Sequence, residues 1–153
     1  MILIQSLMGQ SSVNYWIFST NSITIIKTQT DFNTILATET TNINNNTFNY
    51  NNSVIFVKPD VFASYPQGDK VYFKLMKNQL KTVSPNRLIV TACIVISNTG
   101  KIEDIGITKS CGEFEYDLKA VNFLRTLGLW TPASHQGSSV SSLLYLPVIF
   151  YPL

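Results

Sequence analysis

Few residues of this chain have the types and spacing that catalysis or metal binding requires. Cys111–Glu113 sets a thiol beside a carboxylate ahead of a helix, where an activated thiolate could act as a nucleophile. No base is predicted near it, so a structural cysteine is the better interpretation. His135 is the only histidine and has no second His or Cys at metal-ligand spacing. The carboxylates of Glu103–Asp104 and Glu113–Asp117 are typical of solvated turns. We therefore expect no enzyme activity, no metal and no cofactor.

Composition narrows the class of protein. The chain has 153 residues, of which 45% are hydrophobic and 13% charged, and polarity comes mainly from Asn, Ser and Thr. The net charge of +2 is too small to indicate a nucleic-acid or anionic-membrane partner. A bilayer span needs about 20 apolar residues. The longest apolar run, Leu143–Leu153, is shorter and is interrupted by Pro147 and Pro152.

The first third is predicted to be a separate extension. Met1–Gln10 is similar to the end of a signal peptide, with an ordinary first strand as the alternative. Short β-type runs rich in Ile, Thr and aromatic residues follow, up to about residue 40. The Asn-rich run Asn42–Asn52 is low in complexity and is predicted to be a linker. We expect an extension over residues 1–53 and a folded domain over residues 54–153.

The second half has the pattern helix, strand, strand, helix, strand. Asp69 is a candidate N-cap for a helix running to about Leu80, and Asp117 for the second helix. Leu88–Ser97 and Ile102–Ser110 are predicted to form a hairpin, and Val140–Phe150 the last strand. The predicted fold class is α+β, with two helices packed on a small antiparallel sheet after a β-rich N-terminal extension.

The hairpin register determines the state of the two cysteines. A turn near residues 99 and 100 places Cys93 opposite Gly106 and Cys111 opposite Leu88. The two thiols would then be about 16 Å apart along the ladder, which is beyond the reach of a disulfide. We expect free thiols.

The last strand is the candidate binding element. Pro147 cannot donate to a sheet ladder, which favours an edge strand with that missing donor facing outward. The outward groups would belong to Leu143, Tyr145 and Ile149, and an extended peptide could add there, with Tyr145, Ile149 and Tyr151 giving selectivity. The alternative is a terminal strand that only completes the sheet. Both faces of the strand are apolar, so one needs a cover from the first 40 residues, a second copy or a partner.

An ordered set of short motifs resembles the C-terminal domain of TonB-like energy transducers, over residues 54–153. In that family an Asp-x-x-Ala opens the second helix, a Trp-x-Pro-Ala/Gly turn follows, and a Gly-x-x-Val precedes a Leu-Pro-Ile/Val-x-Phe strand. The matching segments are Asp117–Ala120, Trp130–Ala133, Gly137 with Val140, and Leu146–Phe150; Val95–Ile102 and Tyr65–Asp69 resemble the family's hairpin and first helix start.

The resemblance implies a periplasmic domain that captures the Ton-box peptide of outer-membrane TonB-dependent transporters by strand addition. The family's transmembrane helix and Pro-rich spacer are not found in this chain, and Gln67 replaces a Gly of the helix-opening turn. We therefore expect peptide binding without force transmission. The alternative is a self-association domain that forms a strand-exchanged homodimer through the same edge and has no transport role.

Overall fold

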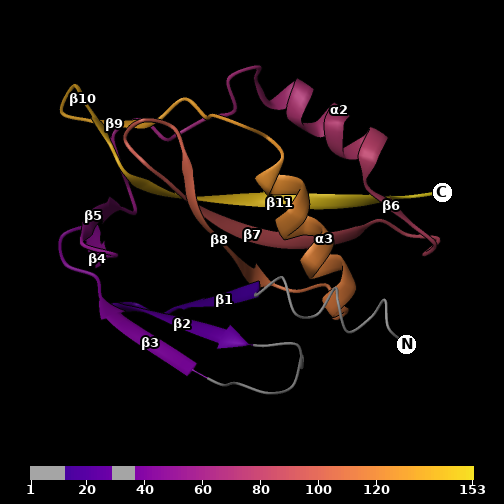
Figure 1. Cartoon of the computed structure of the whole chain (residues 1–153), viewed down its shortest axis with the longest axis horizontal. Helices are drawn as coiled ribbons and strands as arrows, with labels where there is room; N and C mark the ends of the chain where they lie inside the picture. The colour runs from indigo at the N-terminus through magenta and orange to yellow at the C-terminus, as the bar shows by residue number, and fades with distance from the viewer. Residues whose placement is uncertain (1–12, 29–36) are drawn as a thin grey trace.

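The computed structural model describes residues 13–28 and 37–153, which form a mostly β protein (Figure 1). The helices among them are α2 (Asp69–Gln79) and α3 (Phe114–Arg125). The strands are β1 (Val13–Phe18), β2 (Ser22–Thr28), β3 (Ala37–Asn42), β4 (Thr47–Tyr50), β5 (Ser53–Phe56), β6 (Lys81–Thr82), β7 (Leu88–Ile96), β8 (Ile102–Lys109), β9 (Ala133–His135), β10 (Ser138–Val140) and β11 (Ser142–Pro152).

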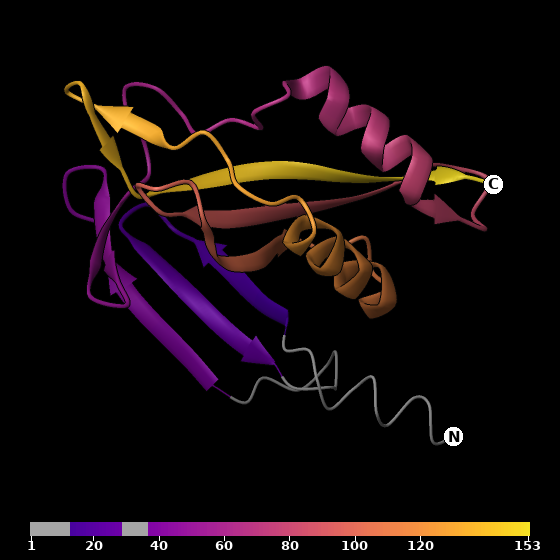
Figure 2. The same cartoon turned by 45° about the horizontal axis from the view of Figure 1, so that its top comes forward.

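One mixed sheet organises the molecule, with eight strands in the order β3-β2-β1-β8-β7-β11-β5-β4. Most neighbours are antiparallel, whereas β1 runs parallel to β8, and β5 and β6 run parallel to β11. The sheet curls until it is nearly closed, because β3 and β4 at its two ends are joined by a tight turn. Figure 2 shows β1–β3 beneath the long β7 and β11 strands and α2 above them. Residues of both helices pack in the same core, on the other face of the sheet from the core that β1 and β2 help to form.

The predicted fold class is wrong. Two helices on a small antiparallel sheet were expected, but the sheet is large, mixed and nearly closed, and the helices are a minor part of it. The difference arises because β1–β3 do not stand apart: β1 pairs with β8 through Asn14 and Tyr15, which extends the hairpin sheet into the first third of the chain. Sequence patterns indicate strands in the first third of the chain but not this parallel pairing between distant segments.

Two apolar cores lie on the two faces of the sheet, since β7 is buried on both sides. The helix-side core includes Tyr72, Met76, Val90, Ala92, Ile94, Ile96, Ile107, Tyr116, Ala120, Val121, Leu124, Trp130, Val148 and Phe150. The concave-side core consists of Trp16, Ile23, Ile25, Phe48, Ile55, Cys93, Val95 and Leu143. The N-terminal strands therefore supply the cover that the second apolar face of the last strand requires.

The Asn-rich run contains strand β4 between two tight turns. Asn45 and Asn46 have positive φ (50° and 67°), as do Asn51 and Asn52 (46° and 62°). Two consecutive positive φ angles are what a type I′ hairpin turn requires, and Asn tolerates them better than other residues with a side chain. The composition of this run thus makes two tight turns. One leads from β3 into β4 and is closed by the Asn44–Thr47 bridge, and the other joins the β4–β5 hairpin.

Several local predictions are confirmed, and both predicted helix caps are wrong: Gly68, not Asp69, is the N-cap of α2. β7 and β8 form the expected hairpin, Cys93 lies opposite Gly106, and both cysteines are free. The second helix begins at Phe114 rather than after Asp117. Asp117 is fully buried beneath the helix and accepts a hydrogen bond from the Tyr15 hydroxyl at 2.8 Å. Its short polar side chain ties α3 to β1 instead of capping the helix.

Gly106 lets the Trp16 indole lie directly on β8. A Cβ at this position would stand 2.0 Å from Trp16 Cδ1, so any side chain must displace the ring. We expect Gly106→Ala to lower the free energy of unfolding by about 1–3 kcal/mol, measured by urea unfolding. Combining it with Trp16→Phe tests the cause, because the loss of unfolding free energy in the double variant should be smaller than the sum of the losses in the two single variants. Strict additivity would contradict this packing.

Candidate functional site

Four contacts fix which backbone groups of β11 face away from β7. The outward N–H of Tyr151 donates to the Leu80 carbonyl at 3.0 Å, and the outward N–H of Ile149 donates to Met76 Sδ at 3.3 Å. The outward carbonyl of Pro147 accepts from the Tyr72 hydroxyl at 3.0 Å, and that of Ser141 accepts from the Phe56 N–H at 2.9 Å. Odd-numbered residues of β11 therefore point their backbone groups outward, because the register with β7 is continuous.

The four residues predicted to bind peptide lie in different surroundings. The side chain of Leu143 is buried in the concave-side core, and the parallel pairing of Ser142 with Phe56 engages the edge beside it. Ile149 is covered by α2 through Met76, and Tyr151 pairs with β6 while its ring lies under Arg87 at 4.8 Å. Among the described residues, Tyr145 is the one of the four whose outward N–H and carbonyl have no recorded partner.

Tyr145 borders a groove of about 370 Å³, which we call the edge groove. Its lining is formed by Phe62, Ala63, Ser64, Tyr65, Asp69, Tyr72, Phe73, Trp130 and Leu144–Pro147. One wall is the segment that enters α2, held in place by pairing of Ser64 with Thr131. The opposite wall is the edge of β11 itself. The edge groove therefore runs beside the stretch of strand that no neighbour pairs.

Exposed aromatic side chains gather at the edge groove. Phe62 is 50% exposed and Phe73 is 39% exposed. Beneath them Tyr65 packs edge-to-face on the buried Trp130, with ring centroids 5.5 Å apart. The Tyr145 ring lies on the other face of the strand, against Phe18 at 5.1 Å. A cluster of exposed aromatic rings beside an open strand edge is typical of a protein-binding surface.

Sequence reasoning missed most of this groove. Phe62 lies in an irregular segment and Phe73 lies on a helix, and neither position is part of an edge-strand pattern. The available signal was the spacing on α2: Asp69, Tyr72 and Phe73 fall on one side of a helix next to its buried residues. That spacing shows a shared side but not which strand lies beside it.

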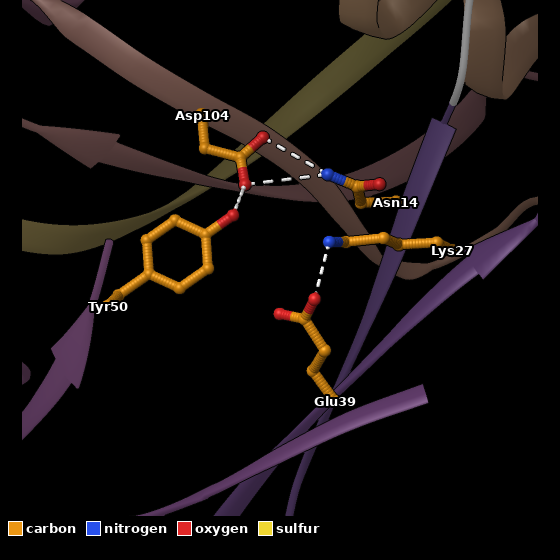
Figure 3. Close-up of polar contacts among 5 residues, drawn as sticks. All are labelled: Asn14, Lys27, Glu39, Tyr50 and Asp104. Carbon is orange, nitrogen blue, oxygen red and sulfur yellow. Dashed lines mark hydrogen bonds and ion pairs between the residues drawn. The ribbon is translucent and has the colours of Figure 1, made fainter. Parts of the chain in front are cut away.

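The concave face carries a polar cluster at one end (Figure 3). The Asp104 carboxylate on β8 accepts hydrogen bonds from Asn14 Nδ2 at 3.2 Å, from the Tyr50 hydroxyl and from the N–H of Ile105 at 2.8 Å. Beside it Lys27 and Glu39 form an exposed ion pair at 2.7 Å. The acceptor capacity of Asp104 is largely taken by β1, β4 and its own strand. The cluster thus links three strands of the curled sheet, and a structural role accounts for it.

The remaining candidate chemical groups do not come together. The pKa of the Cys111 thiol is raised by burial and by the neighbouring carboxylates Asp117 and Glu113, which disfavours the reactive thiolate. His135 pairs with Asp60 at 3.0 Å and stacks near Phe56. Within the described residues, no group of three or more His, Cys, Asp or Glu side chains is placed to hold a metal ion.

Comparison with known proteins identifies no relative of this chain. No protein-family model, curated protein or solved structure matches the chain. The similarity to TonB-like transducers therefore rests on the short motifs alone. Among the described residues, no helix is long and apolar enough to cross a membrane.

Tyrosine ionisation should destabilise the fold at alkaline pH. Burial raises the pKa of Tyr15, Tyr50, Tyr72 and Tyr145 above the usual value of about 10, and the carboxylates near Tyr15 and Tyr50 raise it further. A raised folded-state pKa gives stability that is complete below the unfolded-state pKa and is lost as pH rises. We expect the free energy of unfolding, measured in urea, to fall above about pH 10.

Tyr50→Phe tests the polar cluster in the same experiment. Loss of the bond to Asp104 should cost about 1–2 kcal/mol at pH 8, while the alkaline slope becomes shallower because one titrating phenol is gone. Lys27→Gln, which breaks the exposed ion pair, is the control and should cost less than about 1 kcal/mol. If the free energy of unfolding of Tyr50→Phe falls with rising pH as steeply as that of the wild type, the Tyr50 phenol does not contribute to the alkaline loss of stability, and its predicted role is refuted.

Proposed function

We propose that this protein binds an extended segment of a partner protein by strand addition beside Tyr145. The observation that carries this proposal is the free outward N–H and carbonyl of Tyr145, facing the aromatic edge groove. Backbone groups of an added strand would complete the ladder, and its alternate side chains would fill the edge groove. We expect the bound segment to be apolar, because aromatic rings dominate the exposed lining of the edge groove.

The free edge limits the length of the segment. β5 engages β11 at Ser142, and the Tyr72 hydroxyl takes the carbonyl of Pro147. The stretch between them spans about 17 Å at the usual strand rise, enough for about four residues of partner in ladder contact. A short recognition motif inside a longer or disordered partner region fits this constraint better than a folded domain.

The motif resemblance makes a Ton-box segment of an outer-membrane TonB-dependent transporter the first peptide to try, and a periplasmic location belongs to the same proposal. The alternative occupant is the same edge of a second copy, which would give a strand-exchanged homodimer. A molecular mass that rises with concentration in the wild type, and stays that of a monomer in the Tyr145→Pro variant below, would favour that alternative.

Removing the outward donor should abolish binding while leaving the sheet intact. Tyr145→Pro deletes an N–H that does not bond to β7, and Pro147 already occupies the equivalent orientation two residues along. Titration of ¹⁵N-labelled protein with Ton-box-like peptides should shift amides around Leu143–Leu146 in the wild type and in Tyr145→Ala, but not in Tyr145→Pro. A peptide N-methylated at its paired residue should also fail to bind. Equal binding by all forms would rule out strand addition.

The edge groove should contribute affinity through Phe73. Phe73→Ala removes a ring that is 39% exposed, so we expect about tenfold weaker peptide binding with little change in the free energy of unfolding. Fluorescence anisotropy with a labelled peptide measures the affinity. The control is Val83→Ala, which removes an exposed apolar side chain that does not line the edge groove and should bind like wild type. Unchanged affinity in Phe73→Ala would place the ligand elsewhere.

A further inference from the structure

The outer face of α2 carries a row of lysines that the peptide-binding site does not use. Lys70, Lys74 and Lys77 recur at spacings of four and three residues, which places them on one side of the helix. All three are exposed. We call these three residues the lysine stripe. They make up 3 of the 11 basic residues of the chain, so the small net charge conceals a local concentration of positive charge.

The lysine stripe is not neutralised by the protein itself. Within the described part of the chain, no recorded ion pair involves any of its members, and Asp69 is the one acidic residue of α2. By contrast, Lys27 and Lys119 each pair with a glutamate. Neighbouring lysines at these spacings repel one another. A row of uncompensated like charges on a helix that borders a groove is complementary to an anionic partner.

The position of α2 connects the lysine stripe to the edge groove. The inner side of α2 supplies Asp69, Tyr72 and Phe73 to the edge groove, and Tyr72 and Met76 occupy the β11 edge from Pro147 to Ile149. A segment bound beside Tyr145 therefore cannot continue along β11 in that direction. It must leave the sheet at α2, and the outer face of this helix carries the lysine stripe. Figure 1 shows α2 alongside the half of β11 that leads to the C-terminus.

From this arrangement we propose that the partner segment has two parts: an apolar stretch that pairs beside Tyr145, and an acidic flank that lies on the lysine stripe. This inference rests on the proposed strand addition and adds the chemistry of the partner. The apolar part supplies register and the acidic part supplies charge complementarity. A segment with the same apolar part and a neutral or basic flank would bind less tightly.

Peptides that share one apolar core test the proposal. The first is the core alone, the second carries a flank of three glutamates, and the third carries a flank of three glutamines. The two flanked peptides are each made with the flank after the core and with the flank before it. We expect one glutamate version to bind about tenfold more tightly than its glutamine counterpart at low salt, with the advantage shrinking as salt is added. All core-containing peptides should shift the Tyr145 amide, which reports strand addition separately from the flank.

Matched lysine variants locate the effect. Lys70→Gln combined with Lys74→Gln should remove most of the glutamate advantage and leave binding of the core peptide unchanged. The control is Lys101→Gln with Lys109→Gln, which removes the same charge from exposed positions on and beside β8 and should retain the advantage. Equal losses in both variants would show a general charge effect and overturn the assignment to the lysine stripe.

The remaining outcomes separate the two proposals. If the core shifts Tyr145 but glutamate and glutamine flanks bind equally, the acidic-flank inference fails and strand addition stands. If no peptide shifts Tyr145, strand addition fails and the inference fails with it. If acidic flanks give no advantage but vesicles of anionic lipid or a DNA oligonucleotide bind in a Lys70- and Lys74-dependent way, the occupant is a membrane or a nucleic acid, and the inference is overturned.

Discussion

Burial of β7 and β11 on two faces is the constraint on which the rest of the structure depends. Val90, Ala92 and Ile94 face the helices, while Cys93 and Val95 face the opposite side, and all are buried. The two helices can cover only one of these faces. The second must be covered by more sheet, and the chain achieves this by curling β1–β5 beneath β7 and β11. Closure in turn requires the close contact of Trp16 on Gly106 and the polar links at Asp104.

Because the sheet curls, no single neighbouring strand pairs with the whole outward edge of β11, and its backbone N–H and carbonyl groups find partners in several separate segments. Short parallel pairings with β5 and β6 serve its two ends, and side chains of α2 serve Pro147 and Ile149. Proline at position 147 removes a donor at the point where a helix, not a strand, is the neighbour. What is left is the backbone of Tyr145, too short a gap to promote uncontrolled sheet growth but long enough for a defined peptide contact. The same arrangement that protects the edge therefore defines the candidate site.

Sequence reasoning predicted local features well and long-range ones poorly. The β7–β8 hairpin, its register at Cys93 and Gly106, and the outward orientation of Pro147 all follow from turn chemistry and strand periodicity, which act over a few residues. The fold class was mispredicted because the parallel contact of Asn14 with Gly106 joins segments about 90 residues apart and has no local signature. The Asn-rich run was interpreted from its composition, although its paired asparagines are also a hairpin signal.

The candidate site shows the same division. Tyr145 could be selected from the last strand alone, because alternation and Pro147 indicate its orientation. Burial of Leu143, the covering of Ile149 by Met76 and the aromatic wall at Phe62 and Phe73 depend on how distant segments pack. The lysine spacing on α2 is visible in the sequence, but its relevance to a binding site appears only once α2 is placed beside β11.

Hydrogen exchange of the β11 amides, followed by NMR on the free protein, tests the central claim most directly. The account predicts that the Tyr145 amide exchanges much faster than those of Leu144, Leu146, Ile149 and Tyr151, because it alone in this set has an outward N–H without a partner. Fast exchange at Tyr145 between protected neighbours would support an open edge. Protection of Tyr145 equal to that of its neighbours would mean that the edge is already occupied, and would contradict the account.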